Sequence, residues 1–183
     1  MFEFPKRYAD AVARARVPSG FLIVFLFGWL AHPSARSLEI GLPVSMLGLA
    51  LRAWAAGCLF KDQKLATSGP YQYTRNPLYL GTLVVAAGLV AAARNPWLAA
   101  VFAAVFVLVY LPVIQLEQQH LHRLFPEYAA YAREVPALAP RFTGARGGSP
   151  AFRWSQYVRN REYQAGLGWL AGAAFLLWKW VQG

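Results

Sequence analysis

Long apolar runs constrain the fold of this chain more than any other feature of its sequence. An α-helix needs about 20 apolar residues to cross the hydrocarbon core of a bilayer. The runs are apolar on every face and do not alternate as barrel strands must. We therefore predict an all-α integral membrane protein with about five transmembrane helices. The five runs are Val17–Ala31, Leu38–Leu51 (which holds one charge, Glu39), Leu78–Ala93, Trp97–Leu116 and Gly166–Trp178.

Composition excludes an ordinary soluble domain. Hydrophobic residues make up 57% of the 183 residues and charged residues only 14%, whereas soluble domains carry roughly a quarter charged residues. The run Trp97–Leu116 is the clearest span, and Val17–Ala31 is short for one. Basic residues precede Val17–Ala31, so a cleavable signal peptide is an alternative for it. The many spans that follow favour a first transmembrane helix.

The basic residues predict an orientation. If the N-terminus is cytoplasmic, 14 of the 18 lysines and arginines fall on the cytoplasmic side, three fall outside, and Arg52 lies near the end of the second span. This is the positive-inside pattern. Because the sequence shows no organelle signal, we expect the inner membrane of a prokaryote. The net charge of +10 then faces anionic lipid headgroups. Membrane lipid is the expected partner, and no nucleic-acid motif is present.

The chain is expected to form one membrane domain over residues 1–183. Residues 48–142 form its core, 143–165 a basic linker followed by an interfacial helix, and 166–181 the last span. The two long segments predicted on the cytoplasmic side are Phe60–Pro77 and Glu117–Ala165, so function is expected there. The single cysteine, Cys58, has no internal disulfide partner and is expected to pack in the core.

The first of these segments is rich in turn-forming and aromatic residues. Gly69-Pro70 marks a turn. Asn76 and Pro77 fit the start of a helix, with the amide as its cap. Tyr71 and Tyr79 fit an interfacial aromatic belt, and they equally suit packing on a flat heterocycle or a sulfonium cation.

Glu117 is the first charge after some twenty apolar residues of the fourth span. A carboxylate near hydrocarbon is a functional hypothesis by default, and a helix-end acid reaching water is the alternative. Partial burial would suit it to take a proton from a substrate. Glu117 is also the expected partner of Arg52, which otherwise reaches the headgroups. His120 and His122 lie near it, but too few ligands converge for a metal site.

Both segments together resemble the membrane methyltransferases that include isoprenylcysteine carboxyl methyltransferases and phospholipid N-methyltransferases. The resemblance covers about residues 48–142. It rests on Leu65 to Gly69 followed by Pro70-Tyr71, on Arg75-Asn76-Pro77 with Tyr79 and Gly81, on Asn95-Pro96, and on Glu117 with the aromatic residues that follow.

The resemblance implies S-adenosylmethionine as cofactor and a lipophilic acceptor that enters from the bilayer. The acceptor would be a lipid amine, or a prenylated or small hydrophobic carboxyl or thiol. Glu117 and Arg52 are the candidate catalytic residues, and no metal is implied. The cofactor contacts implied are Gln63, Lys64, Leu65, Ala66, Tyr71, Asn76, Pro77, Leu78, Tyr79 and Gln118.

The sequence leaves two other functions open, and departures from the family pattern bear on the acceptor and on catalysis. Val113 stands where the prenylcysteine enzymes carry an arginine, which argues against a prenylcysteine acceptor. Gln118 replaces the second acid of a pair, and Asn76 stands where histidine is common. The alternatives are a nicotinamide-dependent membrane reductase and a non-catalytic protein that binds lipid or cofactor. The oligomeric state is not readable from the sequence.

Overall fold

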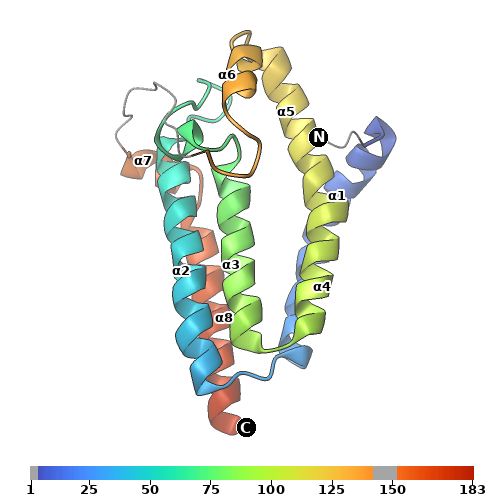
Figure 1. Cartoon of the computed structure of the whole chain (residues 1–183), viewed down its shortest axis with the longest axis vertical. Helices are drawn as coiled ribbons and strands as arrows, with labels where there is room; N and C mark the ends of the chain where they lie inside the picture. Colours follow the sequence, from blue (N-terminus) through green and yellow to red (C-terminus); the bar gives the residue numbers. More distant parts are fainter. Residues whose placement is uncertain (1–3, 142–151) are drawn as a thin grey trace.

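The computed structural model describes residues 4–141 and 152–183, and over these ranges every regular element is a helix (Figure 1). Five long helical runs pass up and down the molecule. This confirms the prediction of an all-α fold. The elements are α1 (Lys6–Leu30), α2 (Ala35–Cys58), the 3₁₀ turn η1 (Gly69–Gln72), α3 (Pro77–Ala93), α4 (Pro96–Val105), the π-helical η2 (Phe106–Tyr110), α5 (Leu111–Leu124), α6 (Tyr128–Glu134), α7 (Trp154–Arg159) and α8 (Tyr163–Gln182).

Two of these runs are long and apolar enough to cross a membrane. They are α2 and the continuous run Pro96–Leu124, with mean hydropathies of 1.3 and 2.5. A third qualifies if the two halves of α1, which bend by 51° between Ala15 and Pro18, count as one span. The apolar α3 is shorter, at 17 residues. Five spans and a cytoplasmic N-terminus therefore stay predictions.

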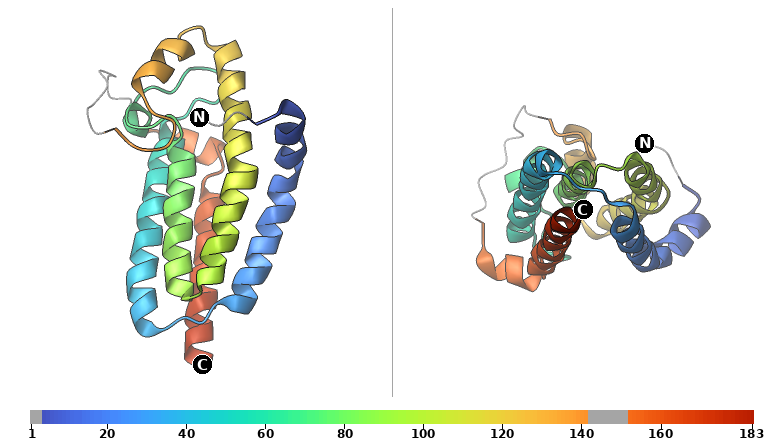
Figure 2. Two further views of the ribbon diagram at one scale, coloured as in Figure 1. Left: turned by 45° about the vertical axis from the view of Figure 1, so that its right-hand side comes forward. Right: turned by 90° about the horizontal axis from the view of Figure 1, so that it is seen from below.

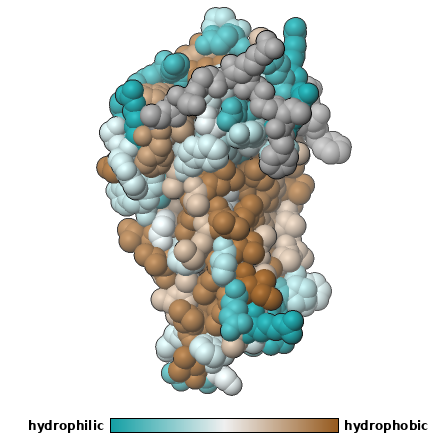
Figure 3. Space-filling view, turned by 60° about the vertical axis from the view of Figure 1, so that its left-hand side comes forward, coloured by the Kyte–Doolittle hydropathy of each residue, from teal (hydrophilic) through white to brown (hydrophobic). Residues whose placement is uncertain are grey.

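The surface of the bundle carries large apolar side chains. Phe21 and Trp29 on α1 are 73% and 68% exposed, and Leu47 on α2 is 69% exposed. Figure 3 shows hydrophobic side chains over the middle of one face, with hydrophilic ones gathered towards its two ends. Contiguous exposed apolar surface is expensive in water, so this band is suited to contact with lipid.

Helices α2 and α3 lie unusually close because glycines face each other across them. A Cβ atom on Gly48 would lie 2.7 Å from the carbonyl oxygen of Gly81, and one on Gly88 would collide with the backbone of Gly41 and Ser45. Small residues at such contacts let helix backbones approach in membranes. Seen from below, α8 lies beside this pair and α1 lies beside α4 (Figure 2).

The long connections gather at one end of the bundle. The α2–α3 connection with η1, the helix α6 and the short α7 all lie at the upper end in Figure 1, and the turns α1–α2 and α3–α4 lie at the lower end. Within the range 143–165, expected to hold a linker and an interfacial helix, the structure has the six-residue α7 (Trp154–Arg159), and α8 begins at Tyr163. The position of α7 at the membrane interface stays a prediction. The part of the predicted linker that falls within 142–151 lies outside the described residues.

Candidate functional site

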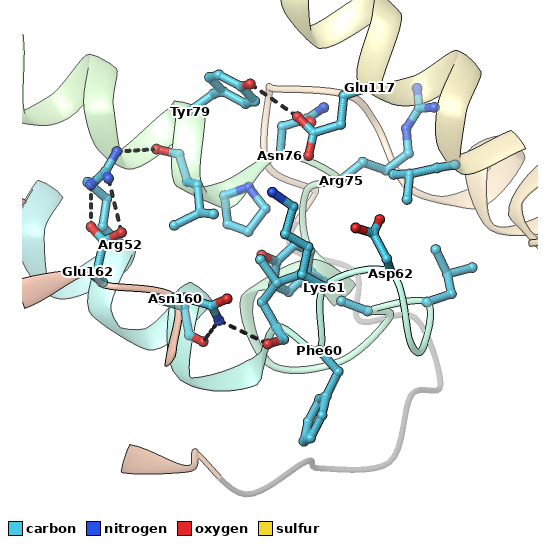
Figure 4. Close-up of a pocket in the computed structure, with 18 of the residues that line it drawn as sticks. Arg52, Phe60, Lys61, Asp62, Arg75, Asn76, Tyr79, Glu117, Asn160 and Glu162 are labelled. Carbon is cyan, nitrogen blue, oxygen red and sulfur yellow. Dashed lines mark hydrogen bonds and ion pairs between the residues drawn. The ribbon is translucent and has the colours of Figure 1, made fainter. Parts of the chain in front are cut away.

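A cavity of about 800 Å³ opens at the upper end of the bundle, between the α2–α3 connection, α5 and the start of α8. Its volume is within the range of small-molecule sites, roughly 300–1,000 Å³. Its walls come from segments far apart in the sequence, and Figure 4 shows their side chains converging on one space. Both predicted cytoplasmic segments contribute to it.

The first wall is the loop that leads into η1. Leu65 and Tyr71 are both 6% exposed. The hydroxyl of Tyr131 on α6 donates to the carbonyl oxygen of Tyr71 at 2.7 Å, so α6 holds this loop in place. Burial raises the pKa of Tyr71, and the charge of Glu117 raises it further. Burial likewise raises the pKa of Tyr131, so both hydroxyls stay protonated at neutral pH.

The second wall is the start of α3. Pro77 occupies the first turn as predicted, but the side chain of Asn76 does not cap the helix. Its Nδ2 donates instead to the carbonyl oxygen of Ala137 at 2.8 Å, and the hydroxyl of Thr74 donates to the same oxygen at 3.1 Å. The cap prediction is wrong because the segment after α6 folds back over this loop and supplies an acceptor that local sequence does not reveal.

Tyr79 and Glu117 close the cavity between α3 and α5. The hydroxyl of Tyr79 donates to Oε2 of Glu117 at 3.1 Å. The ring of Tyr110, at the end of the π-helical turn, meets the ring of Tyr79 edge-on, with centroids 6.2 Å apart. Glu117 is exposed. The partial burial that suited it to proton transfer is therefore not found, and its hydrogen bond to Tyr79 is the observed restraint on it.

Arg52 does not pair with Glu117, which corrects the sequence-based expectation. Its Nε donates to Oε1 of Glu162 at 2.6 Å and its Nη2 to Oε2 at 3.0 Å, a bidentate pair. Its Nη1 donates to Oγ1 of Thr82 at 2.5 Å. Glu162 immediately precedes α8, 110 residues along the chain, and no local pattern connects it to Arg52.

The cavity brings together most of the residues expected to bind cofactor, and both candidate catalytic residues. Gln63 and Gln118 are the exceptions. Gln63 is exposed, and Nε2 of Gln118 is buried without a partner among the described residues. Whether the lining residues bind a cofactor stays a prediction. The lining residues from the expected set are Arg52, Lys64, Leu65, Ala66, Tyr71, Asn76, Pro77, Leu78, Tyr79 and Glu117.

Several lining residues were not selected from the sequence. Asn160 and Glu162 come from the α7–α8 junction, and Tyr110 comes from η2. Asn160 donates through Nδ2 to the carbonyl oxygens of Ala56 and Leu59 at 2.9 and 3.0 Å, and so supplies a side-chain donor to carbonyl groups at the C-terminal end of α2. The sequence signal for Glu162 was an acid next to an apolar run, the same signal that selected Glu117.

The histidines near Glu117 have ordinary partners. Nε2 of His120 lies 3.3 Å from Oδ1 of Asp62, and both side chains are about half exposed. The ring of His122 meets Tyr128 edge-on, with centroids 5.3 Å apart. Within residues 4–141 and 152–183, no group of three or more histidine, cysteine, aspartate or glutamate side chains could hold a metal ion.

Arg75 brings to the cavity a hydrogen-bond donor that has no acceptor among the described residues. Its Nη1 donates to the hydroxyl of Tyr128 at 3.2 Å, but its buried Nε has no partner among the described residues. Buried donors without partners are costly. Arg75 lines the same space as Tyr71 and Leu78. A ligand that has flat and apolar parts as well as hydrogen-bond acceptors would find complementary groups in this set of side chains.

Comparison with known proteins identifies the family. The sequence model of the phospholipid methyltransferases matches residues 41–128. The protein-S-isoprenylcysteine O-methyltransferase B of Arabidopsis thaliana is 34% identical over 115 residues, 56% of this chain and 58% of that protein. Most of the residues that line the cavity lie within the matched range. Over residues 41–128 the chain thus matches the phospholipid methyltransferase family, and it is also similar to an isoprenylcysteine methyltransferase.

Two further relatives bear names from metal resistance. The cobalt-zinc-cadmium resistance protein CzcN of Cupriavidus metallidurans is 40% identical over 145 residues, 76% of this chain and 66% of that protein. The nickel-cobalt-cadmium resistance protein NccN of Alcaligenes xylosoxydans xylosoxydans is 41% identical over 108 residues, 56% of this chain. The chain spans slightly less than two thirds of the first and 51% of the second. No solved structure matches the chain.

Proposed function

We propose that this protein transfers a methyl group from S-adenosylmethionine to a lipophilic acceptor at the cytoplasmic face of the membrane. One observation carries the proposal. A single cavity joins the family motif between Leu65 and Tyr79 with Glu117 on α5, beside a bundle whose surface is apolar. If the fold had kept these two segments apart, the motif would not line a cavity together with Glu117.

The lining residues suggest how the cofactor would be held. Tyr71 and Leu78 offer apolar surface, Arg75 offers a donor, and the protonated hydroxyl of Tyr131 keeps the Tyr71 backbone in place. S-adenosylmethionine would supply the methyl group as part of a sulfonium cation, and the carboxylate of Glu117 favours positive charge in the cavity. Tyr79 restrains that carboxylate through its hydroxyl.

Catalysis on this proposal consists mainly of alignment and exclusion of water, which can lower a barrier substantially without a metal ion. Glu117 is exposed and hydrogen-bonded, so its proposed role is to orient the acceptor and to balance charge. Val113 lines the cavity one helical turn before Glu117. It gives no charge to pair with a carboxylate, which supports an acceptor other than prenylcysteine.

The test is transfer of radiolabelled methyl groups from S-adenosylmethionine into lipid. The purified protein is reconstituted into vesicles of phosphatidylethanolamine and phosphatidylglycerol, with and without a prenylated cysteine analogue, and the organic extract is counted. Label in the extract that is lost with Glu117→Ala supports the proposal. Cofactor binding without label in any lipid arm would instead support a non-catalytic binding protein. Binding of a nicotinamide cofactor, with none of S-adenosylmethionine, would support the reductase alternative.

A further inference from the structure

The α7–α8 junction is a wall of the cavity that the family match does not reach. The match ends at residue 128, yet Asn160, Glu162 and Ala165 all line the cavity. The residues expected to contact the cofactor lie between 63 and 79 and near 118, on other walls. The junction therefore lines a part of the cavity where the motif supplies no expected cofactor contact.

The junction is fixed to the rest of the bundle by polar contacts at several points. Asn160 binds the two carbonyl oxygens at the end of α2, and the backbone nitrogen of Arg153 donates to the carbonyl oxygen of Gly57 at 3.1 Å. Farther along α8, Nε1 of Trp169 donates to Oγ of Ser45 at 2.7 Å. This segment is thus held in a defined position at the cavity.

The Arg52–Glu162 pair connects this wall to the helix that carries the family motif. The side chains of Arg52 and Glu162 are 22% and 10% exposed. Both carboxylate oxygens of Glu162 accept from Arg52, and the remaining Arg52 nitrogen binds Thr82 on α3. Bidentate pairs of this kind fix orientation as well as position. Figure 4 shows the two side chains pointing at one another at one side of the cavity.

The surface next to the junction suits the chains of a lipid. Leu167 and Leu170, in the first turns of α8, are 61% and 57% exposed. A lipid that lies along them brings its polar end to the junction. We propose that the α7–α8 junction is the wall against which the lipophilic acceptor binds, and that Arg52 and Glu162 are a positioning pair that holds this wall against α3. This inference rests on the proposed function for the identity of its occupant.

The test uses a phosphatidylethanolamine that carries a diazirine in its acyl chain, mixed into phosphatidylcholine vesicles with the full-length protein. After illumination, peptides are analysed for crosslinks at residues 160–170 and, as an internal reference, at the exposed α1 residues Phe21 and Phe25. The proteins compared are the wild type, Arg52→Gln, Glu162→Gln and the double variant. Calorimetry with S-adenosylmethionine is run on each.

We expect junction crosslinks in the wild type that fall at least about threefold in each single variant, within the coupling found for contacting residues. The double variant should lose no more than the worse single one, because the two residues act as a unit. Labelling of α1 should not change, because Phe21 and Phe25 lie on another helix, away from the pair.

Three results would overturn the inference: absence of junction crosslinks in the wild type, equal junction labelling in all four proteins, or losses that affect α1 as much as the junction. The last result would mean that the substitutions only loosen the bundle. Absence of S-adenosylmethionine binding in the wild type would contradict the proposed function instead. The crosslinking pattern would then still decide whether the junction is a lipid-binding wall.

Discussion

The hydroxyl of Tyr79 donates a hydrogen bond to the carboxylate of Glu117 at 3.1 Å and so connects α3 to α5 across the cavity. Helix α3 and the run from α4 to α5 are joined by a turn at the lower end of the bundle and lie farther apart above it (Figure 1). The contact places the last tyrosine of the family motif beside the first charged residue of the second cytoplasmic segment. A site assembled in this way should depend on the hydroxyl itself as well as on the aromatic ring.

Tyr79→Phe keeps the ring and removes this hydrogen bond. A net hydrogen bond is worth about 0.5–1.5 kcal/mol, so we expect S-adenosylmethionine to bind about two- to tenfold more weakly, as measured by calorimetry. Tyr73→Phe is the matched control, because Tyr73 does not line the cavity and its hydroxyl has no hydrogen bond to any described residue. Equal affinities for the two variants would contradict a role of the Tyr79 hydroxyl.

The buried tyrosines predict a loss of stability in alkaline solution. The pKa values of Tyr71 and Tyr131 are raised by burial above the ordinary value of 10.0. The unfolded chain therefore releases protons first, and the free energy of unfolding falls as the pH rises above about 10. Their contribution is complete below that pH. Thermal unfolding from pH 8 to 12 in detergent, followed together with tyrosinate absorbance, checks this.

Tyr131→Phe distinguishes the contribution of Tyr131 to the alkaline loss of stability from that of Tyr71. It should cost about 1 kcal/mol at neutral pH through the lost bond to the Tyr71 carbonyl oxygen. It should also make the alkaline decline shallower, because one of the two titrating groups is gone. An alkaline decline as steep as in the wild type would mean that Tyr131 ionises as freely in the folded protein as in the unfolded chain.

The close contact of α2 and α3 can be tested with two glycine variants. A Cβ atom at position 88 would collide with the backbone of Gly41 and Ser45, whereas one at position 172 on α8 meets nothing within 4 Å. Gly88→Ala should lower the free energy of unfolding by about 1–3 kcal/mol through overpacking. Gly172→Ala should leave it unchanged or raise it by up to about 1 kcal/mol, through helix propensity. Equal thermal midpoints for the two variants would contradict the observed packing.

Asn76→Ala should loosen the segment that folds over the cavity. The variant removes the bond from Nδ2 to the Ala137 carbonyl oxygen, which should cost about 1 kcal/mol of stability. Since this bond holds the segment after α6 over the loop, proteolysis near Ala137 should also become faster. Gln119→Ala, at an exposed position, serves as control. Unchanged proteolysis in Asn76→Ala would mean that Thr74 alone holds the segment.

The helices were predictable because membrane helices bury their backbone polar groups internally and leave apolar side chains to face lipid. The run Trp97–Leu116 lies within the continuous helix Pro96–Leu124. The π-helical turn Phe106–Tyr110 within it was not predicted, because hydropathy is insensitive to one extra residue in a turn. The apolar run Val17–Ala31 covers only the second half of α1, because the first turns of that helix carry charged residues.

The site was predictable to the extent that its residues are neighbours in sequence. Tyr71, Pro77 and Tyr79 form one motif, and that motif lines the cavity. The partner of Arg52 was wrong because two carboxylates, Glu117 and Glu162, follow the same sequence pattern. Only the return of α8 alongside α2 and α3 decides between them.

The most direct test of the central claim is calorimetric titration of S-adenosylmethionine into the detergent-purified protein, alongside Tyr71→Ala and Tyr73→Phe. The account predicts one binding event with micromolar affinity that is lost in Tyr71→Ala and retained in Tyr73→Phe, whose ring lies outside the cavity. No heat of binding from a wild-type sample that unfolds cooperatively would contradict the account, because the cavity would then not be a site for this cofactor.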